Sequence, residues 1–351
     1  MESGKKTVLV IGATGVIGGA HVRSLAGRED VDVVALSRRE LGVQASNLRH
    51  LALDLILQVA LSSNALEAVT HMVYAAFVDA PNWEAQQQPN CELFASALDL
   101  IERHCPALRH VTLLQGMKAY GSYLGPFKTP AKEEDPRIPQ GHYYYDQQDA
   151  LTQRSSACGW TWTALRPHVV LGPARNSPQN LIAVIGVYAS LLKARGEPLT
   201  FPGAPTTFDV IYQATDAGLL SQSIEWAGIE PRAAGEVFNI TNGDFFRWRH
   251  VWPKIADLFG MEAAGVEPRT LVDWMQEANS LWDELIARHD LEPNPLEDLV
   301  SWRFADYVFG TTWDVMASTF KCRRAGFLEF VDSEQVLLER LAELRTLKIV
   351  P

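Results

Sequence analysis

A glycine-rich turn near the N-terminus constrains the fold of this chain more than any other feature. Residues 7–11 form a short run rich in Val and Ile, Gly12 follows it, and residues 16–25 have helical spacing. Gly12, Gly15 and Gly18 are spaced as in the turn that leads from a parallel strand into a helix. Gly12 permits the tight turn, Gly15 lets a pyrophosphate approach the backbone, and Gly18 allows close helix–strand packing. Free N–H groups at the helix start attract phosphate, so the turn predicts dinucleotide binding.

The rest of the first half alternates between strands and helices. We expect strands at residues 31–36, 48–53, 72–76, 110–114 and 161–165, and helices at 82–102 and 144–157. Strands that alternate with helices form right-handed βαβ units. The pattern therefore predicts an α/β fold with a Rossmann-type, doubly wound parallel sheet.

Beyond Gly172 the alternation becomes irregular. Helices are expected at 181–193 and 216–226 and a strand at 236–240, and the chain from residue 247 onward is mainly helical in pattern. We expect residues 1–172, completed by 206–240, to form the dinucleotide-binding domain. Residues 173–205 and 241–351 then form a smaller, mainly helical substrate-binding lobe.

The second expected strand ends in Ser37-Arg38-Arg39. A site specific for NAD normally presents an acidic residue here, which accepts a hydrogen bond from the ribose 2′-hydroxyl. Two guanidinium groups instead suit a 2′-phosphate, which they can hold with paired hydrogen bonds. The sequence therefore favours NADPH over NADH, with a solvated basic turn as the alternative interpretation.

The ends of the third and fourth expected strands carry further candidate cofactor contacts. They are Asp54 and Leu55 after the third strand, and Ala75 and Ala76 after the fourth. Ligands of open α/β sheets collect at this carboxyl edge. Asp54 can accept from the adenine amino group, although a helix N-cap is an equally good interpretation, and the two small alanines leave room for the adenosine.

Charge and cysteine usage exclude several functional classes. The chain has 42 acidic and 31 basic residues, a formal charge of −11, which disfavours binding to nucleic acid or to an anionic membrane. The longest apolar run, residues 181–192, is too short to span a bilayer. The four cysteines lie far apart without a CxxC pair, which is typical of a cytoplasmic protein without a disulfide framework or a metal site.

The residues after the fifth strand and around the tyrosine cluster 143–145 indicate a particular family. Short-chain dehydrogenase/reductases normally carry Tyr-x-x-x-Lys, but Gln148 stands where Tyr144 requires the lysine. A lysine lies instead at Lys118, within QGMKAYG at residues 115–121. This relocation, together with HYYYDQQD at 142–149, resembles the progesterone 5β-reductase/iridoid synthase-like enzymes, whose motifs are TGxKHYxG and NFYYxxED. The resemblance continues through residues 166–172, 180, 187–189, 238–244 and 326–327 to the C-terminal residues 348–351.

This resemblance implies an NADPH-dependent reduction of the C=C bond of an α,β-unsaturated carbonyl. The catalytic pair falls on Lys118 and Tyr144, with Tyr145 as the alternative register. The phenol stabilises the charge that develops on the carbonyl oxygen, and the ammonium strengthens the phenol as a donor. The family's cofactor contacts fall on Gly12, Thr14, Gly15, Val16, Arg38, Arg39, Asp54, Leu55 and Ser177. The resemblance also implies a homodimer.

Three departures from the family motifs affect the expected pocket. Gln115 replaces Thr, Ala119 replaces the His after the lysine, and His142-Tyr143 replaces Asn-Phe. They leave the proposed pair intact but change the polarity around it. Candidate pocket residues for an apolar carbonyl substrate are Phe127, Tyr145, Asn180, Phe304 and Trp313, although aromatic residues in such a lobe are more often plain core.

Two other functions compete with enone reduction. The same tyrosine and lysine can serve a carbonyl reductase, in which the hydride reaches the C=O carbon. A regulator that binds NADPH without turnover is the third hypothesis, but such regulators typically lack both residues. His142 and His168 are candidate proton donors, with structural histidines as the alternative.

Overall fold

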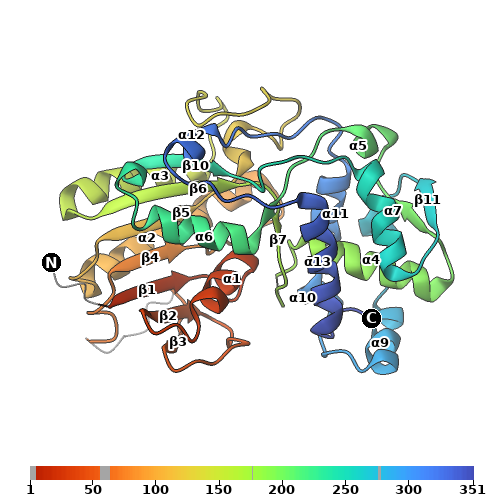
Figure 1. The fold of residues 1–351 in the computed structure, drawn as a ribbon, viewed down its shortest axis with the longest axis horizontal. Helices are drawn as coiled ribbons and strands as arrows, with labels where there is room; N and C mark the ends of the chain where they lie inside the picture. Colours follow the sequence, from red (N-terminus) through yellow and green to blue (C-terminus); the bar gives the residue numbers. More distant parts are fainter. Residues whose placement is uncertain (1–4, 56–63, 176, 276–277) are drawn as a thin grey trace.

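The computed structural model describes residues 5–55, 64–175, 177–275 and 278–351. Its centre is a parallel sheet of seven strands in the order β10-β6-β5-β4-β1-β2-β3 (Figure 1). The strands are β1 (Lys6–Ile11), β2 (Val31–Ser37), β3 (Leu48–Ala52), β4 (His71–Tyr74), β5 (His110–Leu114), β6 (Thr161–Pro167) and β10 (Glu236–Ile240). The α/β fold with a Rossmann-type parallel sheet is thus confirmed.

Helices cover both faces of this sheet because its strands are apolar on both sides. Along β1, Leu9 and Ile11 join the core beneath α2 (Trp83–His104) and α3 (Tyr143–Cys158). Val8 and Val10, which point the other way, join the core beneath α1 and α6. Helix α1 spans Val16–Leu25, and α6 spans Ala217–Ala227. The sheet is therefore a rigid middle layer whose carboxyl edge carries the connecting loops.

Chain segments from the second half complete the sheet unit. Strand β10 pairs with β6 and forms the edge of the sheet. Helix α12 (Phe320–Arg324) also lies against it, since Cys322, Ala325 and Phe327 belong to the same core as α1 and α6. Part of the segment 241–351 thus packs on the sheet unit rather than in the separate lobe.

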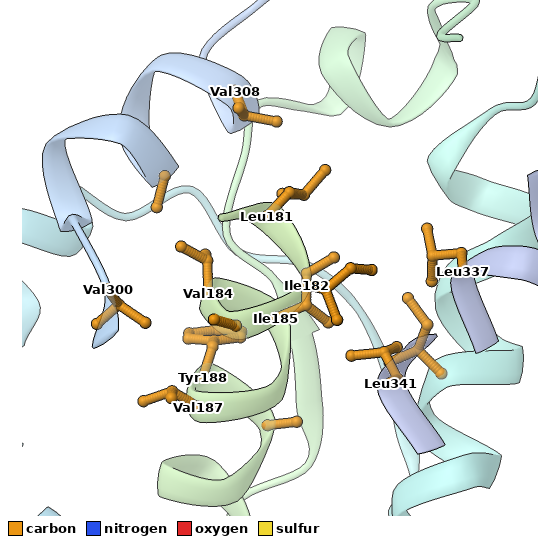
Figure 2. Packing of buried hydrophobic residues seen from close by; sticks show 14 of the residues in the cluster. Leu181, Ile182, Val184, Ile185, Val187, Tyr188, Val300, Val308, Leu337 and Leu341 are labelled. Carbon is orange, nitrogen blue, oxygen red and sulfur yellow. The ribbon is translucent and has the colours of Figure 1, made fainter. Parts of the chain in front are cut away.

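The second lobe is built around α4 (Leu181–Arg195), which is buried from Leu181 to Leu192. Figure 2 shows Leu337 and Leu341 of α13 (Ser333–Thr346) on one side of α4, Val300 on the other, and Val308 beyond the Leu181 end of the helix. The lobe's helices are α7 (Trp248–Phe259), α8 (Leu271–Trp274), α9 (Ala278–His289), α10 (Leu296–Leu299), α11 (Trp302–Phe309) and α13 (Ser333–Thr346). A helix buried on all sides explains the long apolar run, and no helix of the described residues has the length and apolar character of a membrane span.

Several short elements complete the two lobes. They are the 3₁₀-helices η1 (Met117–Tyr120) and η2 (Pro231–Ala233), helix α5 (Pro205–Asp209), and the strand pairs β7 (Val170–Leu171) with β9 (Thr215–Asp216) and β8 (Leu199–Phe201) with β11 (Ala263–Val266). Strand β4 ends at Tyr74, two residues before the expected end. Ala75 and Ala76 therefore lie in the loop at the carboxyl edge, where the two lobes meet.

Candidate active site

A cavity of about 600 Å³ opens at the carboxyl edge of the sheet, between the sheet unit and α11. Of the thirteen predicted cofactor residues, twelve line it: Gly12, Thr14, Gly15, Val16, Ser37, Arg38, Arg39, Asp54, Leu55, Ala75, Ala76 and Ser177. Gly18 lies behind the turn. The same cavity is lined by Lys118 and Tyr144, so a single space brings the predicted cofactor residues together with the predicted catalytic pair.

The glycine turn is shaped by close backbone contacts. Gly12 has φ +87°, and a Cβ on it would lie 2.7 Å from the backbone of Ala75 and Ala76. A Cβ on Gly18 would lie 2.3 Å from the Gly12 carbonyl oxygen, so α1 packs on the turn at a distance that only glycine allows. The nearest protein atom to a Cβ on Gly15 would be at 3.6 Å, an ordinary contact, so protein packing does not require glycine there. An open face at Gly15, beside a helix N-terminus without a side-chain cap, fits a bound pyrophosphate.

The end of β2 presents its two arginines to the cavity. Both are exposed, and Arg39 lies 3.9 Å from the Asp298 carboxylate of α10. The Ser37 hydroxyl donates to the Arg39 carbonyl at 2.7 Å and lies 3.0 Å from His50 Nε2, so it fixes the turn at the edge of the cavity. The backbone of the arginine pair is therefore held in place from two neighbouring strands.

Tyr144 lies in the first turn of α3, and its local structure follows from His142. The His142 Nδ1 accepts the Tyr144 N–H at 3.2 Å and caps the helix. The Tyr144 hydroxyl oxygen points to Gly116, where it lies 3.4 Å from the position that a Cβ would take. Burial raises the pKa of Tyr144, while the Tyr143 hydroxyl and the Arg166 charge lower it. The phenol is consequently protonated at neutral pH, which is the form that can donate a hydrogen bond.

Arg166 and two glutamines form a network behind Tyr144. Arg166 is buried at the end of β6, and its guanidinium donates to Gln115 Oε1 at 3.0 Å and to Gln148 Oε1 at 3.1 Å. Gln115 also donates to the Tyr144 carbonyl at 2.7 Å. The position four residues after Tyr144, which usually holds a lysine, thus contacts the cation of Arg166. The departure at Gln115 forms part of the same network.

Lys118 approaches the cavity from η1, on a different element from Tyr144. Its ammonium nitrogen lies 3.6 Å from the centre of the Trp83 ring and 5.9 Å from that of Tyr307. Desolvation lowers the pKa of Lys118 to about 7, against the opposing effect of the Asp79 carboxylate. A lysine near this pKa is partly protonated at neutral pH and can change its charge in the working range.

The predicted substrate-pocket residues separate into two groups. Phe304 lines the cavity, whereas Phe127, Tyr145, Asn180 and Trp313 are not among its lining residues. Asn180 is fully buried, accepts from Ile182 N–H and donates to the Gly172 carbonyl, which makes it the N-cap of α4.

The other three residues outside the lining also have structural partners. The Tyr145 hydroxyl donates to the Ala119 carbonyl, and Trp313 Nε1 donates to the Ser122 carbonyl at 3.2 Å. Phe127 packs against the core of the second lobe. Among the described lining residues, the aromatic side chains on the α11 side of the cavity are Phe304 and Tyr307.

The two candidate histidines are neutral in this structure. Burial lowers the pKa of His168 to about 3, and burial together with the charges of Lys118 and Arg166 lowers that of His142 to about 3. A histidine that is neutral at working pH does not act as an imidazolium proton donor. His142 has a structural role as the cap of α3, and His168 lines the cavity as a neutral imidazole.

Sequence reasoning missed three residues of this site: Arg166, Trp83 and Tyr307. In the sequence, Arg166 is recognised only as part of a motif. An arginine at the end of a buried parallel strand nevertheless indicates polar partners nearby, because a buried charge needs them. Trp83 and Tyr307 carried no signal in the sequence, because α2 and α11 meet Lys118 only in the folded chain. Among the described residues no group of three or more metal-ligating side chains occurs.

Comparisons with known proteins identify the family to which the chain belongs. A family model described as a PRISE-like Rossmann-fold domain matches residues 8–298. An (S)-8-oxocitronellyl enol synthase from Nepeta cataria is 29% identical over 99% of this chain and 94% of its own length. A 3-oxo-Δ(4,5)-steroid 5β-reductase from Arabidopsis thaliana is 32% identical over 82% of this chain and 76% of its own length.

Solved structures with the same fold include a UDP-N-acetylglucosamine 4-epimerase from Methanobrevibacter ruminantium. It has a TM-score of 0.68 and 15% identity, and the match covers 98% of both chains. At that identity the likeness concerns the fold alone, and the family rests on the sequence matches. The chain belongs to the PRISE family of NAD(P)H-dependent reductases, within the short-chain dehydrogenase/reductase superfamily.

Proposed function

We propose that this protein is an NADPH-dependent enone reductase that saturates the C=C bond of an α,β-unsaturated carbonyl compound. The observation that carries the proposal is the convergence of Tyr144 and Lys118 on the cavity that contains the glycine turn. The names of the relatives support it, since one forms an enol and another is a steroid 5β-reductase. The substrate class we propose is an apolar enone or enal, steroid-like, terpenoid-like or smaller.

NADPH is the proposed cofactor, and it supplies the hydride when bound. The turn at Gly12 to Gly15 and the N-terminus of α1 would hold its pyrophosphate. Arg38 and Arg39 would hold the 2′-phosphate, because two exposed guanidinium groups line the cavity at the end of β2. Asp54 and Leu55 line the next part of the same wall and would bound the adenosine.

Tyr144 would stabilise the charge that develops on the substrate's carbonyl oxygen. Its raised pKa keeps the hydroxyl proton in place, so the phenol donates a hydrogen bond and does not compete as an anion. Arg166, held by Gln115 and Gln148, contributes a fixed positive charge behind the phenol. The N-cap by His142 and the Gln115 contact to the Tyr144 carbonyl fix the backbone that carries the ring.

Lys118 would provide the second positive charge, from η1 at the wall of the same cavity. A partly desolvated ammonium acts strongly on an oxygen nearby because little water screens it. Lys118 belongs to η1, whereas Tyr144 belongs to α3, so the two groups reach the cavity from separate elements. Two donors on separate elements can hold the substrate's carbonyl oxygen so that the β-carbon, and not the carbonyl carbon, faces the hydride. This placement favours attack at the β-carbon.

The direct test is turnover with a simple cyclic enone. Loss of NADPH absorbance that depends on cyclohex-2-enone is expected, with cyclohexanone as the product. Cyclohexanone itself should be a poor substrate. Mainly allylic alcohol would overturn the proposal in favour of carbonyl reduction, and tight NADPH binding without turnover of any enone in a broad panel would favour a regulator.

A further inference from the structure

An aromatic seat surrounds the functional end of Lys118. The ammonium nitrogen lies over the face of Trp83, 3.6 Å from the ring centre, and Tyr307 lies behind it at 5.9 Å. The Trp83 and Tyr307 rings meet edge to face with centres 5.8 Å apart, and the Tyr123 ring also meets Trp83 edge to face, at 5.0 Å. Trp83 begins α2 and Tyr307 belongs to α11, so the seat joins both lobes around the lysine.

We propose that Trp83 is a positioning residue, whose ring face holds the Lys118 ammonium at the wall of the cavity. The proposal rests on the enone reductase function only for its effect on turnover. Within the described residues, Lys118 has no carboxylate within ion-pair distance and no hydrogen-bond acceptor, so the Trp83 face is its closest favourable contact. Tryptophan offers the strongest cation–π face of the aromatic side chains.

A seat of this kind solves a physical problem of the relocated lysine. Lysine has four rotatable side-chain bonds, and a free ammonium would turn toward water instead of staying at the cavity wall. A carboxylate could restrain it, but a salt bridge would consume the charge that the reaction needs. The ring face restrains the cation while leaving its N–H groups available to an oxygen in the cavity.

The charged and titratable groups around the seat are arranged to leave Lys118 without a direct counterion. The Asp79 carboxylate raises the lysine pKa, but Arg303 binds this carboxylate at 3.0 Å and also donates to the Pro81 carbonyl. On the α3 side, His142 is neutral, with its pKa lowered to about 3. On the α11 side, burial raises the pKa of Tyr307 to about 12, so its phenol is neutral as well.

The test is an NMR titration of Lys118 in protein labelled with ¹³C at the lysine Cε, with Lys118→Met for assignment. Trp83→Leu keeps an apolar side chain and removes the ring face, so the cation loses its contact and the pKa should fall by about 0.4–1.5 units. Trp83→Phe retains a weaker ring face, so the Lys118 pKa should fall less in this variant. Trp226→Leu, which changes a tryptophan that packs on Phe238 and Phe327, is the matched control and should titrate like wild type.

Kinetics supply a second, separable measurement. Trp83→Leu should lower kcat at pH 8 by about 2- to 30-fold, because the fall in the lysine pKa reduces the fraction of ammonium, while the NADPH Kd stays within about twofold of wild type. An unchanged or raised Lys118 pKa in Trp83→Leu would overturn the proposal, and so would an equal loss in Trp226→Leu. The NMR titration needs no turnover, so the two proposals can fail separately. Wild-type enzyme that reduces no enone would refute the proposed function, whereas the titration alone decides whether Trp83 positions Lys118.

Discussion

Replacing Arg38 by alanine should separate NADPH from NADH binding. Arg38 is exposed at the end of β2, lines the cavity, and forms no ion pair within the described part of the chain. Its removal therefore costs the fold little, and the loss falls on the ligand. A charge-assisted hydrogen bond contributes about 1.5–3 kcal/mol, which corresponds to about 10- to 100-fold in the NADPH Kd.

The assay is calorimetric titration with NADPH, NADH and 2′,5′-ADP. NADH lacks the 2′-phosphate, so its Kd should change less than about threefold, well below one tenfold step of 1.4 kcal/mol. Arg103→Ala removes another exposed arginine, from α2 and far from β2 in sequence, and controls for the change in net charge. Equal losses for NADPH and NADH, or no loss for 2′,5′-ADP, would refute the assignment of Arg38 to the 2′-phosphate.

Three further changes test other parts of the account. Tyr144→Phe should lower kcat by about 10²–10³ with an unchanged NADPH Kd, whereas Tyr145→Phe should lower thermal stability, because its hydroxyl holds the Ala119 carbonyl; the reverse result would shift the register by one. Asn180→Ala should cost about 1 kcal/mol in urea unfolding as a lost N-cap, and a large rise in substrate KM would instead make it a pocket residue. The folded protein releases the Lys118 proton near pH 7 and the unfolded chain near 10.5, so the unfolded state binds more protons between these values and stability rises with pH there. Lys118→Met should flatten that rise, measured by urea unfolding at several pH values, and an unchanged slope would contradict the desolvated lysine.

Local sequence patterns were sufficient for the sheet and for the residues that line the glycine-turn end of the cavity. The glycine turn, the arginine pair and the strand ends each lie within a few residues of the element that positions them. Parallel strands also bring their carboxyl ends to one edge by construction. Apart from Gly18, the predicted contacts from Gly12 to Ala76 therefore meet in one cavity although they span more than sixty residues.

The substrate side depends on contacts between distant segments, which a single sequence does not reveal. Arg166 reaches Tyr144 through Gln115, three positions separated by more than twenty residues at each step. Trp83 and Tyr307 converge on Lys118 from opposite lobes. Asn180 did carry a local signal, a capping residue before a long apolar run, which the resemblance to family motifs overshadowed.

The position of the transferred hydrogen tests the central claim most directly. Cyclohex-2-enone would be reduced with NADPH deuterated at C4 of the nicotinamide, using each C4 epimer in turn, and the product examined by NMR and mass spectrometry. An oxygen held by Tyr144 and Lys118 places the β-carbon toward the hydride, so the account predicts cyclohexanone with deuterium on the β-carbon. Cyclohex-2-enol with deuterium on the former carbonyl carbon would contradict it.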